Sequence, residues 1–225
     1  MEKHVIMIGP IQAVWDDGAF AAPLFKPLSD LGYIVTCLDS MQFAAVNDVD
    51  KLADDIAMAI AAVTPVPSLI GGHAFGGLAA ICMAERFPFA AILGLSAPVE
   101  TDHDLREQLT AICTLLDDGM PAHAMDMLHK LVKFSGRDGD VDLQTAQDMS
   151  RMFKYLIALA SRSFMPLQNP KALFLYGTES AMVTSKHIPA SLQRYARSVP
   201  DAGMRLLNDA SAVTVDIILN WIQER

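Results

Sequence analysis

The sequence of 225 residues has little cysteine and little positive charge. Its three cysteines (Cys37, Cys82 and Cys113) are too few and too widely spaced for a disulfide framework or a CxxC metal site. Lys and Arg number 17 against 26 Asp and Glu, so the net charge is −9, which disfavours nucleic acid and anionic membrane surfaces as partners. The six histidines show no metal-ligand spacing, and we expect neither a metal nor a cofactor.

Long hydrophobic runs are missing as well. The first apolar run, residues 5–8, stops at Gly9 and Pro10, which is too short for a signal peptide or a membrane span. By this absence of signals we expect a cytoplasmic protein. Hydrophobic residues make up 52% of the chain and charged residues 19%, which is typical of a globular protein, and the length most simply forms one domain.

What the chain does contain is an alternation of strand and helix patterns. Strands are expected at residues 5–8, 33–38, 68–71, 89–95, 171–176 and 204–207. Helical patterns with apolar stripes follow most of them, and the last helix is expected to bury Val213, Ile217 and Trp221. Short links between alternating strands and helices predict an α/β fold with a mostly parallel sheet of about six strands, covered on both faces.

The alternation breaks once, between about residues 97 and 169. This stretch is rich in methionine and helical in pattern throughout. Because it follows the fourth expected strand, it would lie above the strand ends as a helical lid. The core then consists of residues 1–96 and 170–225.

The turn after the third expected strand carries the most specific motif. Residues 72–77 read Gly-His-Ala-Phe-Gly-Gly, which is the G-x-S-x-G nucleophile elbow with Ala74 in place of the serine. The whole chain resembles the α/β-hydrolase superfamily, and in size and lid position it is most similar to the compact thioesterase and esterase branch. Residues 31–39, with the pattern L-G-Y-x-V-x-x-x-D, and residues 176–180, after the fifth expected strand, add to the resemblance.

The resemblance also implies where a catalytic triad would lie. The nucleophile position is Ala74, the acid position falls on Ser180 with Glu179 adjacent, and the base position falls on Ala212. A triad needs an attacking oxygen, an imidazole that takes its proton, and an acid that orients the imidazole. Alanine supplies neither of the first two groups, so the sequence argues against Ser-His-Asp hydrolysis.

The resemblance further implies an oxyanion hole, which is built from backbone and survives such substitutions. One donor is the N–H of Phe75, and the other comes from the loop after the first strand. Pro10 has no N–H, so Ile11 or Gln12 serves there. We therefore expect a ligand site formed by Ile11, Gln12, His73, Ala74 and Phe75, with His73 in a structural rather than a catalytic role.

Three functions remain open at this stage. The first is a non-hydrolytic homologue, a pseudoenzyme that binds a small acyl or carbonyl ligand or a protein partner. The second is an enzyme of another class on this fold, a lyase, cyclase or isomerase that uses the oxyanion hole. The third is a thioesterase or esterase with an unrecognised triad, which ranks last because no other serine lies on a comparable elbow.

Overall fold

A parallel sheet of six strands forms the centre of the computed structural model, which describes residues 2–46, 48–133, 141–162 and 171–224. The strands lie in the order β2-β1-β3-β4-β5-β6, and every neighbouring pair is parallel. They are β1 (Lys3–Ile8), β2 (Tyr33–Leu38), β3 (Leu69–His73), β4 (Ala91–Leu95), β5 (Ala172–Gly177) and β6 (Ala196–Val199).

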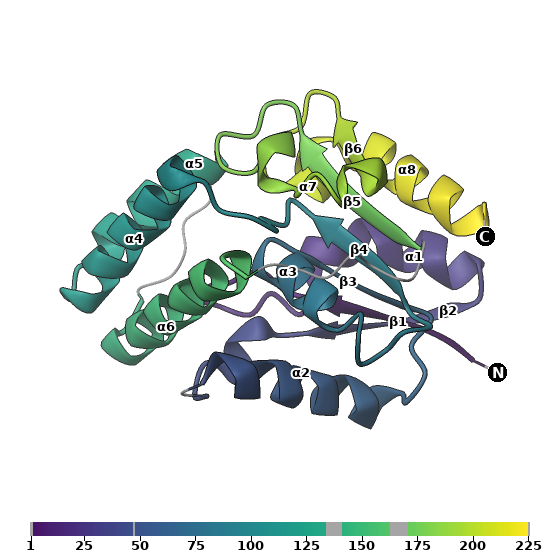
Figure 1. Ribbon diagram of the computed structural model, residues 1–225, viewed down its shortest axis with the longest axis horizontal. Helices are drawn as coiled ribbons and strands as arrows, with labels where there is room; N and C mark the ends of the chain where they lie inside the picture. The colour runs from purple at the N-terminus through teal and green to yellow at the C-terminus, as the bar shows by residue number, and fades with distance from the viewer. Residues whose placement is uncertain (1, 47, 134–140, 163–170, 225) are drawn as a thin grey trace.

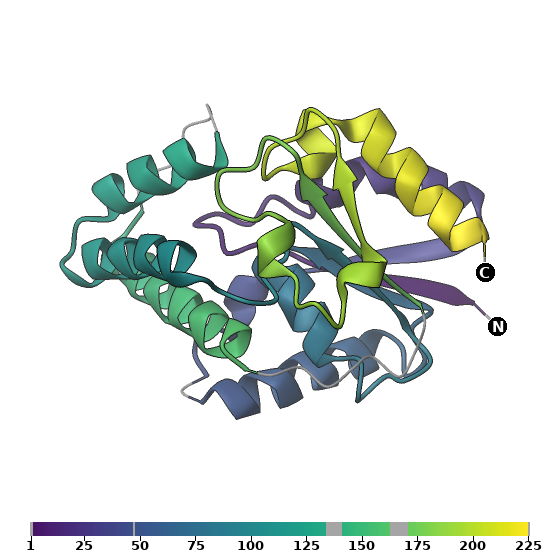
Figure 2. The same cartoon turned by 45° about the horizontal axis from the view of Figure 1, so that its top comes forward.

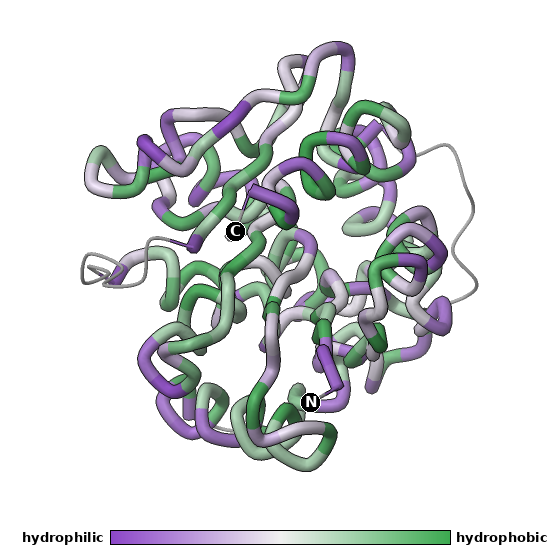
Figure 3. Tube along the Cα trace, turned by 90° about the vertical axis from the view of Figure 1, so that its right-hand side faces the viewer, coloured by the Kyte–Doolittle hydropathy of each residue, from purple (hydrophilic) through white to green (hydrophobic). Residues whose placement is uncertain are grey.

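Helices cover both faces of this sheet. Helices α1 (Ala22–Asp30) and α8 (Ser211–Gln223) lie on one face, and α2 (Val49–Val63) and α3 (Phe75–Cys82) lie on the other (Figure 1). Alternate residues of each strand face opposite sides. In β1, Val5 and Met7 join the core under α1 and α8, while Ile6 and Ile8 join the core under α2 and α3. The central strands are therefore hydrophobic on both faces, and Figure 3 shows these apolar segments running through the middle of the molecule.

Three helices are inserted between β4 and β5, within the stretch that the sequence marks as helical. They are α4 (His103–Asp117), α5 (Pro121–Val132) and α6 (Leu143–Ala160), and we call them the helical insertion. The insertion lies beyond the carboxyl ends of the strands, and both chain termini lie on the opposite side (Figures 1 and 2). The expected boundary of the lid at residues 169 and 170 lies outside the described residues.

Aspartates fix where several of these helices begin. The side chain of Asp102 accepts a hydrogen bond from the Leu105 N–H and so caps α4, and Asp142 caps α6 through the Thr145 N–H. Such caps satisfy N–H groups that have no partner inside the helix. The remaining helical segments are short: α7 (Leu206–Asp209) and 3₁₀ turns at Ala19–Ala21, Ser40–Phe43, Ser185–His187 and Gln193–Tyr195.

Two expectations about the C-terminal part are wrong. Residues 204–207 are not the sixth strand, because that strand is β6, an edge strand whose Arg197 and Ser198 are exposed. An edge strand with a polar surface lacks the apolar run by which buried strands are recognised. Helix α8 is also turned from the expected orientation: Trp221 is buried as expected, but Val213 is exposed and Ile217 is half-buried. The other buried residues are Thr214, Ile218 and Ile222.

Candidate functional site

The elbow between β3 and α3 has the sharp backbone that the sequence predicts. Ala74 has φ 51° and ψ −111°, outside the regions that residues with a side chain favour. The turn is held by two hydrogen bonds, from the Ala74 N–H to the Leu95 carbonyl at 2.8 Å and from the Leu78 N–H to the Ala74 carbonyl at 3.1 Å. The structure thus keeps a strained turn of the kind that exposes a nucleophile, with a methyl group at its tip.

Two glycines allow this turn to lie against β1. A Cβ atom on Gly76 would lie 2.0 Å from the Ile8 carbonyl oxygen, and one on Gly72 would lie 2.4 Å from the backbone of Gly76. No side chain fits at either position. The glycine spacing of the motif therefore follows from the close approach of α3 to the sheet, whether or not the turn carries a nucleophile.

The loops after β5 and β6 meet beside the elbow. Ser180 follows β5, and its hydroxyl lies 3.9 Å from the sulfur of Met204, which follows β6. Met204 lines the same cavity as Ala74. In α/β-hydrolases the triad follows the chain order nucleophile, acid, base. Ala74, Ser180 and Met204 follow one another in the chain in the same order as nucleophile, acid and base, and Met204 comes directly after Gly203.

The structure does not bring Ala212 to this place. Ala212 is exposed in the first turn of α8 and does not line the cavity. The sequence does carry a signal for Met204. The proteins that the chain resembles have a Gly-His pair just before the final helix, and Gly203 is the one glycine after residue 177. Because a strand is expected at residues 204–207, the loop that carries the base position is expected after it, which moves that position from residue 204 to residue 212.

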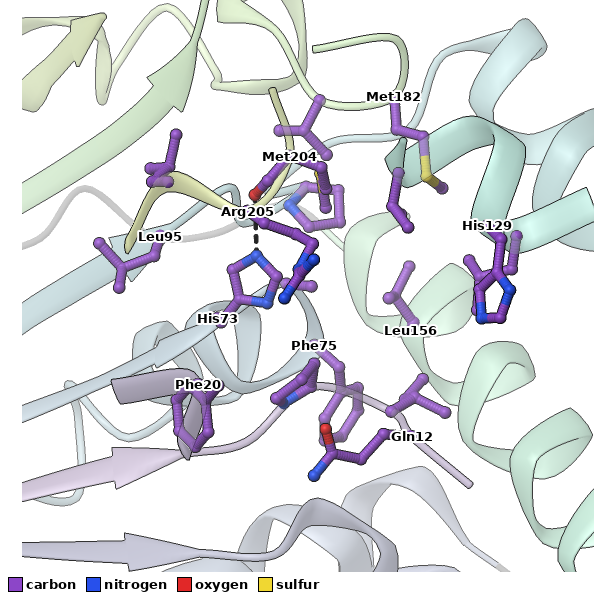
Figure 4. A pocket seen from close by; sticks show the side chains of 18 of the residues that line it. Gln12, Phe20, His73, Phe75, Leu95, His129, Leu156, Met182, Met204 and Arg205 are labelled. Atoms are coloured by element: carbon purple, nitrogen blue, oxygen red, sulfur yellow. Dashed lines mark hydrogen bonds between the residues drawn. The ribbon is translucent and has the colours of Figure 1, made fainter. Parts of the chain in front are cut away.

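His73 is tied to the same loop. Its Nε2 lies 2.8 Å from the Met204 carbonyl oxygen and donates to it, as the dashed line in Figure 4 shows. Burial lowers the pKa of the imidazole, and the nearby Arg205 cation lowers it further, so the ring is neutral. Since Nε2–H is committed to a backbone carbonyl, the geometry fits the structural role expected of His73.

Three backbone amides at the cavity have no hydrogen-bond partner within the described part of the chain. They belong to Phe75, the first residue of α3, and to Ile11 and Gln12 in the loop after β1. The side-chain nitrogen of Gln12 is also buried without a partner. All three residues line the cavity, and Figure 4 labels Gln12 and Phe75 in its wall. These donors are available to an oxygen atom of a ligand.

The cavity itself lies between the elbow and the helical insertion and has a volume of about 330 Å³. The insertion contributes mostly apolar side chains, among them Leu105, Leu109, Leu128, Phe153 and Leu156. The core contributes the polar lining residues Gln12, Asp16, His73, Arg205 and Asn208, and α5 contributes His129. Among the described lining residues there is no serine, threonine, cysteine, lysine or tyrosine.

The free thiols lie elsewhere. Cys37 and Cys82 are half-buried, Cys113 is buried, and none lines the cavity. Burial raises the pKa of Cys37 and of Cys82 to about 11, so both stay protonated at neutral pH. A thiol is a poor nucleophile in that state. Within the described ranges no group of three or more His, Cys, Asp or Glu residues is arranged to hold a metal, and no helix there has the length and hydrophobicity to cross a membrane.

With this geometry described, the chain can be compared with known proteins. It has the α/β-hydrolase fold, because solved structures of that fold align over almost its whole length. No family profile and no curated protein sequence matches the chain.

Three similar structures are hydrolases by name. A thermophilic esterase from Thermogutta terrifontis, with malate bound, has a TM-score of 0.66 and 14% identity, over 99% of this chain and 90% of that one. A carboxylesterase from Nitrososphaera gargenis has a TM-score of 0.68 and 16% identity, over 99% and 90%. The NocB thioesterase domain, in covalent complex with a fluorophosphonate, has a TM-score of 0.63 and 17% identity, over 99% and 95%. At these identities the likeness establishes the fold alone.

Proposed function

We propose that this protein is a non-hydrolytic member of the α/β-hydrolase fold that binds a small acyl or carbonyl ligand in the cavity between the elbow and the helical insertion. The main support for this proposal is the lining of the cavity, in which no described residue offers a hydroxyl or thiol nucleophile. The methyl group of Ala74 stands at the tip of the elbow, and a thioether stands at Met204, where a base would act. Neither group can take up or transfer a proton.

Binding draws on what the substitutions leave intact. The amides of Phe75 and of Ile11 or Gln12 act as an oxyanion-hole pair and hold a carbonyl oxygen of the ligand. The apolar side chains of the insertion, which serves as a lid, take up the rest of the ligand. Pockets for small ligands have this composition, an apolar wall with a few polar groups at fixed positions.

The structural similarity to hydrolases supports one alternative function, that of a thioesterase or esterase with an unrecognised triad. A fluorophosphonate probe separates the two functions, because it reacts covalently with an activated serine. We expect the wild-type protein to remain unlabelled. We also expect it to hydrolyse a p-nitrophenyl ester no faster than buffer alone does. Labelling of the wild type at a defined serine or cysteine, found by peptide mapping, would overturn the proposal.

A set of variants tests whether the three positions are those of a lost triad. The triple variant Ala74→Ser, Ser180→Asp, Met204→His restores the three groups in one place, and we expect it to gain labelling by the probe. Ala74→Ser alone and Ala74→Ser with Ala212→His are matched controls, since Ala212 is exposed on α8 away from the cavity. Equal labelling of the controls and the triple variant would contradict the assignment of Met204.

A further inference from the structure

The polar end of the cavity contains one guanidinium group. Arg205 follows Met204 in the loop after β6, and its half-buried side chain lines the cavity. Figure 4 shows it reaching over the elbow beside the His73 ring. Among the described lining residues it is the only Arg or Lys, in a chain with a net charge of −9.

The loop holds Arg205 at this place through its backbone. The Asp209 Oδ2 atom accepts hydrogen bonds from the Arg205 N–H at 3.1 Å and from the Gly203 N–H at 3.0 Å. Asp16, the acidic residue in the cavity wall, is similarly engaged, because its carboxylate accepts from the N–H groups of Gly18 and Phe20 at 3.1 Å each. The Asp16 and Asp209 carboxylates thus each fix a loop beside the cavity through backbone N–H groups.

The charge and the apolar wall lie at opposite ends of the cavity. Arg205 and Phe75 line the cavity at the core end, while Leu128, Phe153 and Leu156 line it from helices α5 and α6 of the insertion. A ligand that matches both ends is amphipathic and carries its negative charge at one terminus. The planar guanidinium donates two parallel hydrogen bonds to a carboxylate, a geometry that an ester or an alcohol does not match.

Resting on the proposed function, we propose that the ligand is a free monocarboxylic acid with an apolar tail, and that Arg205 binds its carboxylate and sets the preference for acid over ester or alcohol. The tail lies against the helical insertion. The volume of about 330 Å³ is at the small end of the range for ligand pockets, which limits the tail to a short or medium length.

Calorimetric titration with octanoate, methyl octanoate and 1-octanol tests this preference. We expect the wild-type protein to bind octanoate at least tenfold more tightly than the other two, since a hydrogen bond to a charged group contributes about tenfold or more in affinity. Arg205→Gln should remove this advantage and leave the affinity for 1-octanol within about twofold of the wild type. Arg205→Lys, which keeps the charge but loses the paired geometry, should fall between them.

Arg197→Gln is the matched control, because it removes the same charge from an exposed position on β6 outside the cavity. Thermal unfolding of each variant shows that it is folded. If the three ligands bind the wild type equally, or if Arg205→Gln and Arg197→Gln weaken octanoate alike, the preference for a carboxylate is overturned and the apolar pocket remains. If none of the three ligands binds, the proposed function fails as well.

Discussion

At the scale of single residues, the elbow combines a costly backbone with an inert side chain. A residue held in a sparsely populated region of φ and ψ costs about 1–3 kcal/mol, and Ala74 is held there at φ 51°. Such strain persists where the surrounding structure fixes it, and here the two glycines and the Leu95 carbonyl do so. Under the proposed function, the turn keeps one use without a nucleophile, which is to offer the Phe75 N–H to the ligand.

Gly76→Ala tests how closely α3 must approach β1. The new Cβ would lie 2.0 Å from the Ile8 carbonyl oxygen, which is backbone and cannot rotate away. We expect the free energy of unfolding to fall by about 3 kcal/mol or more, the upper range for an overpacked core. Urea denaturation followed by circular dichroism measures this change.

Gly32→Ala serves as the control. Gly32 has φ +79°, and no atom lies within 4 Å of the place that a Cβ would take, so alanine there meets a backbone penalty alone. That penalty is about 1–2 kcal/mol. Equal denaturation midpoints for the two variants would show that the contact between α3 and β1 tolerates a methyl group.

Single residues of the site differ in how far the sequence reveals them. Ala74 and its flanking glycines lie within six consecutive residues, and the local pattern predicts their geometry. Met204 and Arg205 belong to a loop whose position depends on where the preceding strand lies. Because β6 is a short polar edge strand, local hydrophobicity misplaces it and so points to Ala212 instead.

At the scale of elements, the start of α4 is fastened to the loop after β5. The Asp102 carboxylate caps α4, pairs with Lys186, and lies 3.3 Å from Nε2 of His187. The other ring nitrogen of His187, Nδ1, accepts a hydrogen bond from the Thr184 N–H at 3.0 Å. This contact joins the first helix of the insertion to the segment that carries Ser180.

His187 makes the stability of this contact depend on pH. Burial lowers its pKa below the usual 6.5, although the Asp102 carboxylate opposes the shift. The unfolded chain therefore binds a proton at a higher pH than the folded one, and stability that is present above about pH 6.5 is lost as the pH falls below it. Burial lowers the pKa of His73 as well, with an effect of the same sign.

We expect His187→Gln to lower the melting temperature at pH 7 and to make its decline between pH 7 and pH 5 shallower than in the wild type. The remaining slope comes from His73 and from carboxylates. His103→Gln is the control, since the side chain of His103 is 81% exposed in its pairing with Glu107. Scanning calorimetry at several pH values gives both slopes, and parallel curves for His187→Gln and the wild type would exclude this role for His187.

Elements are predictable from the sequence where their periodicity is strong. The strand at residues 33–38 lies where the pattern puts it, because its β-branched residues mark it clearly. The orientation of α8 is not predictable in this way. Val213 and Ile217 form a plausible stripe, but the packed face runs through Thr214, whose hydroxyl donates to the Leu206 carbonyl in α7.

At the scale of the whole molecule, the helical insertion and the sheet share one hydrophobic core. Ile112 of α4 and Met152 of α6 belong to the same buried cluster as Ile8 and Phe75 of the sheet and elbow. The core on the other face of the sheet, under α1 and α8, is a separate cluster. The sequence predicts the insertion and its apolar stripes, but a cavity between two such surfaces depends on side chains far apart in the chain.

Helix α5 is packed less firmly than its neighbours. It buries only Ala124 and Met125, whereas α6 buries eight residues. Helix α4 buries five residues and so resembles α6 rather than α5 in this respect. Because α5 also supplies Leu128, His129 and Val132 to the cavity wall, we expect local opening of this helix to widen the cavity. Regions with few buried apolar contacts open locally at lower free energy than the core.

Hydrogen exchange measured by mass spectrometry tests this division. We expect amides of α4 and α6 to exchange as slowly as those of α3, since the three helices share one core and open together, and amides of α5 to exchange at least tenfold faster. Saturation with a ligand that contacts both walls of the cavity should slow α5 most, because the open form does not bind. If α4, α5 and α6 all exchange fast while α3 stays protected, the insertion opens as a unit. The shared core would then not hold the insertion against the sheet.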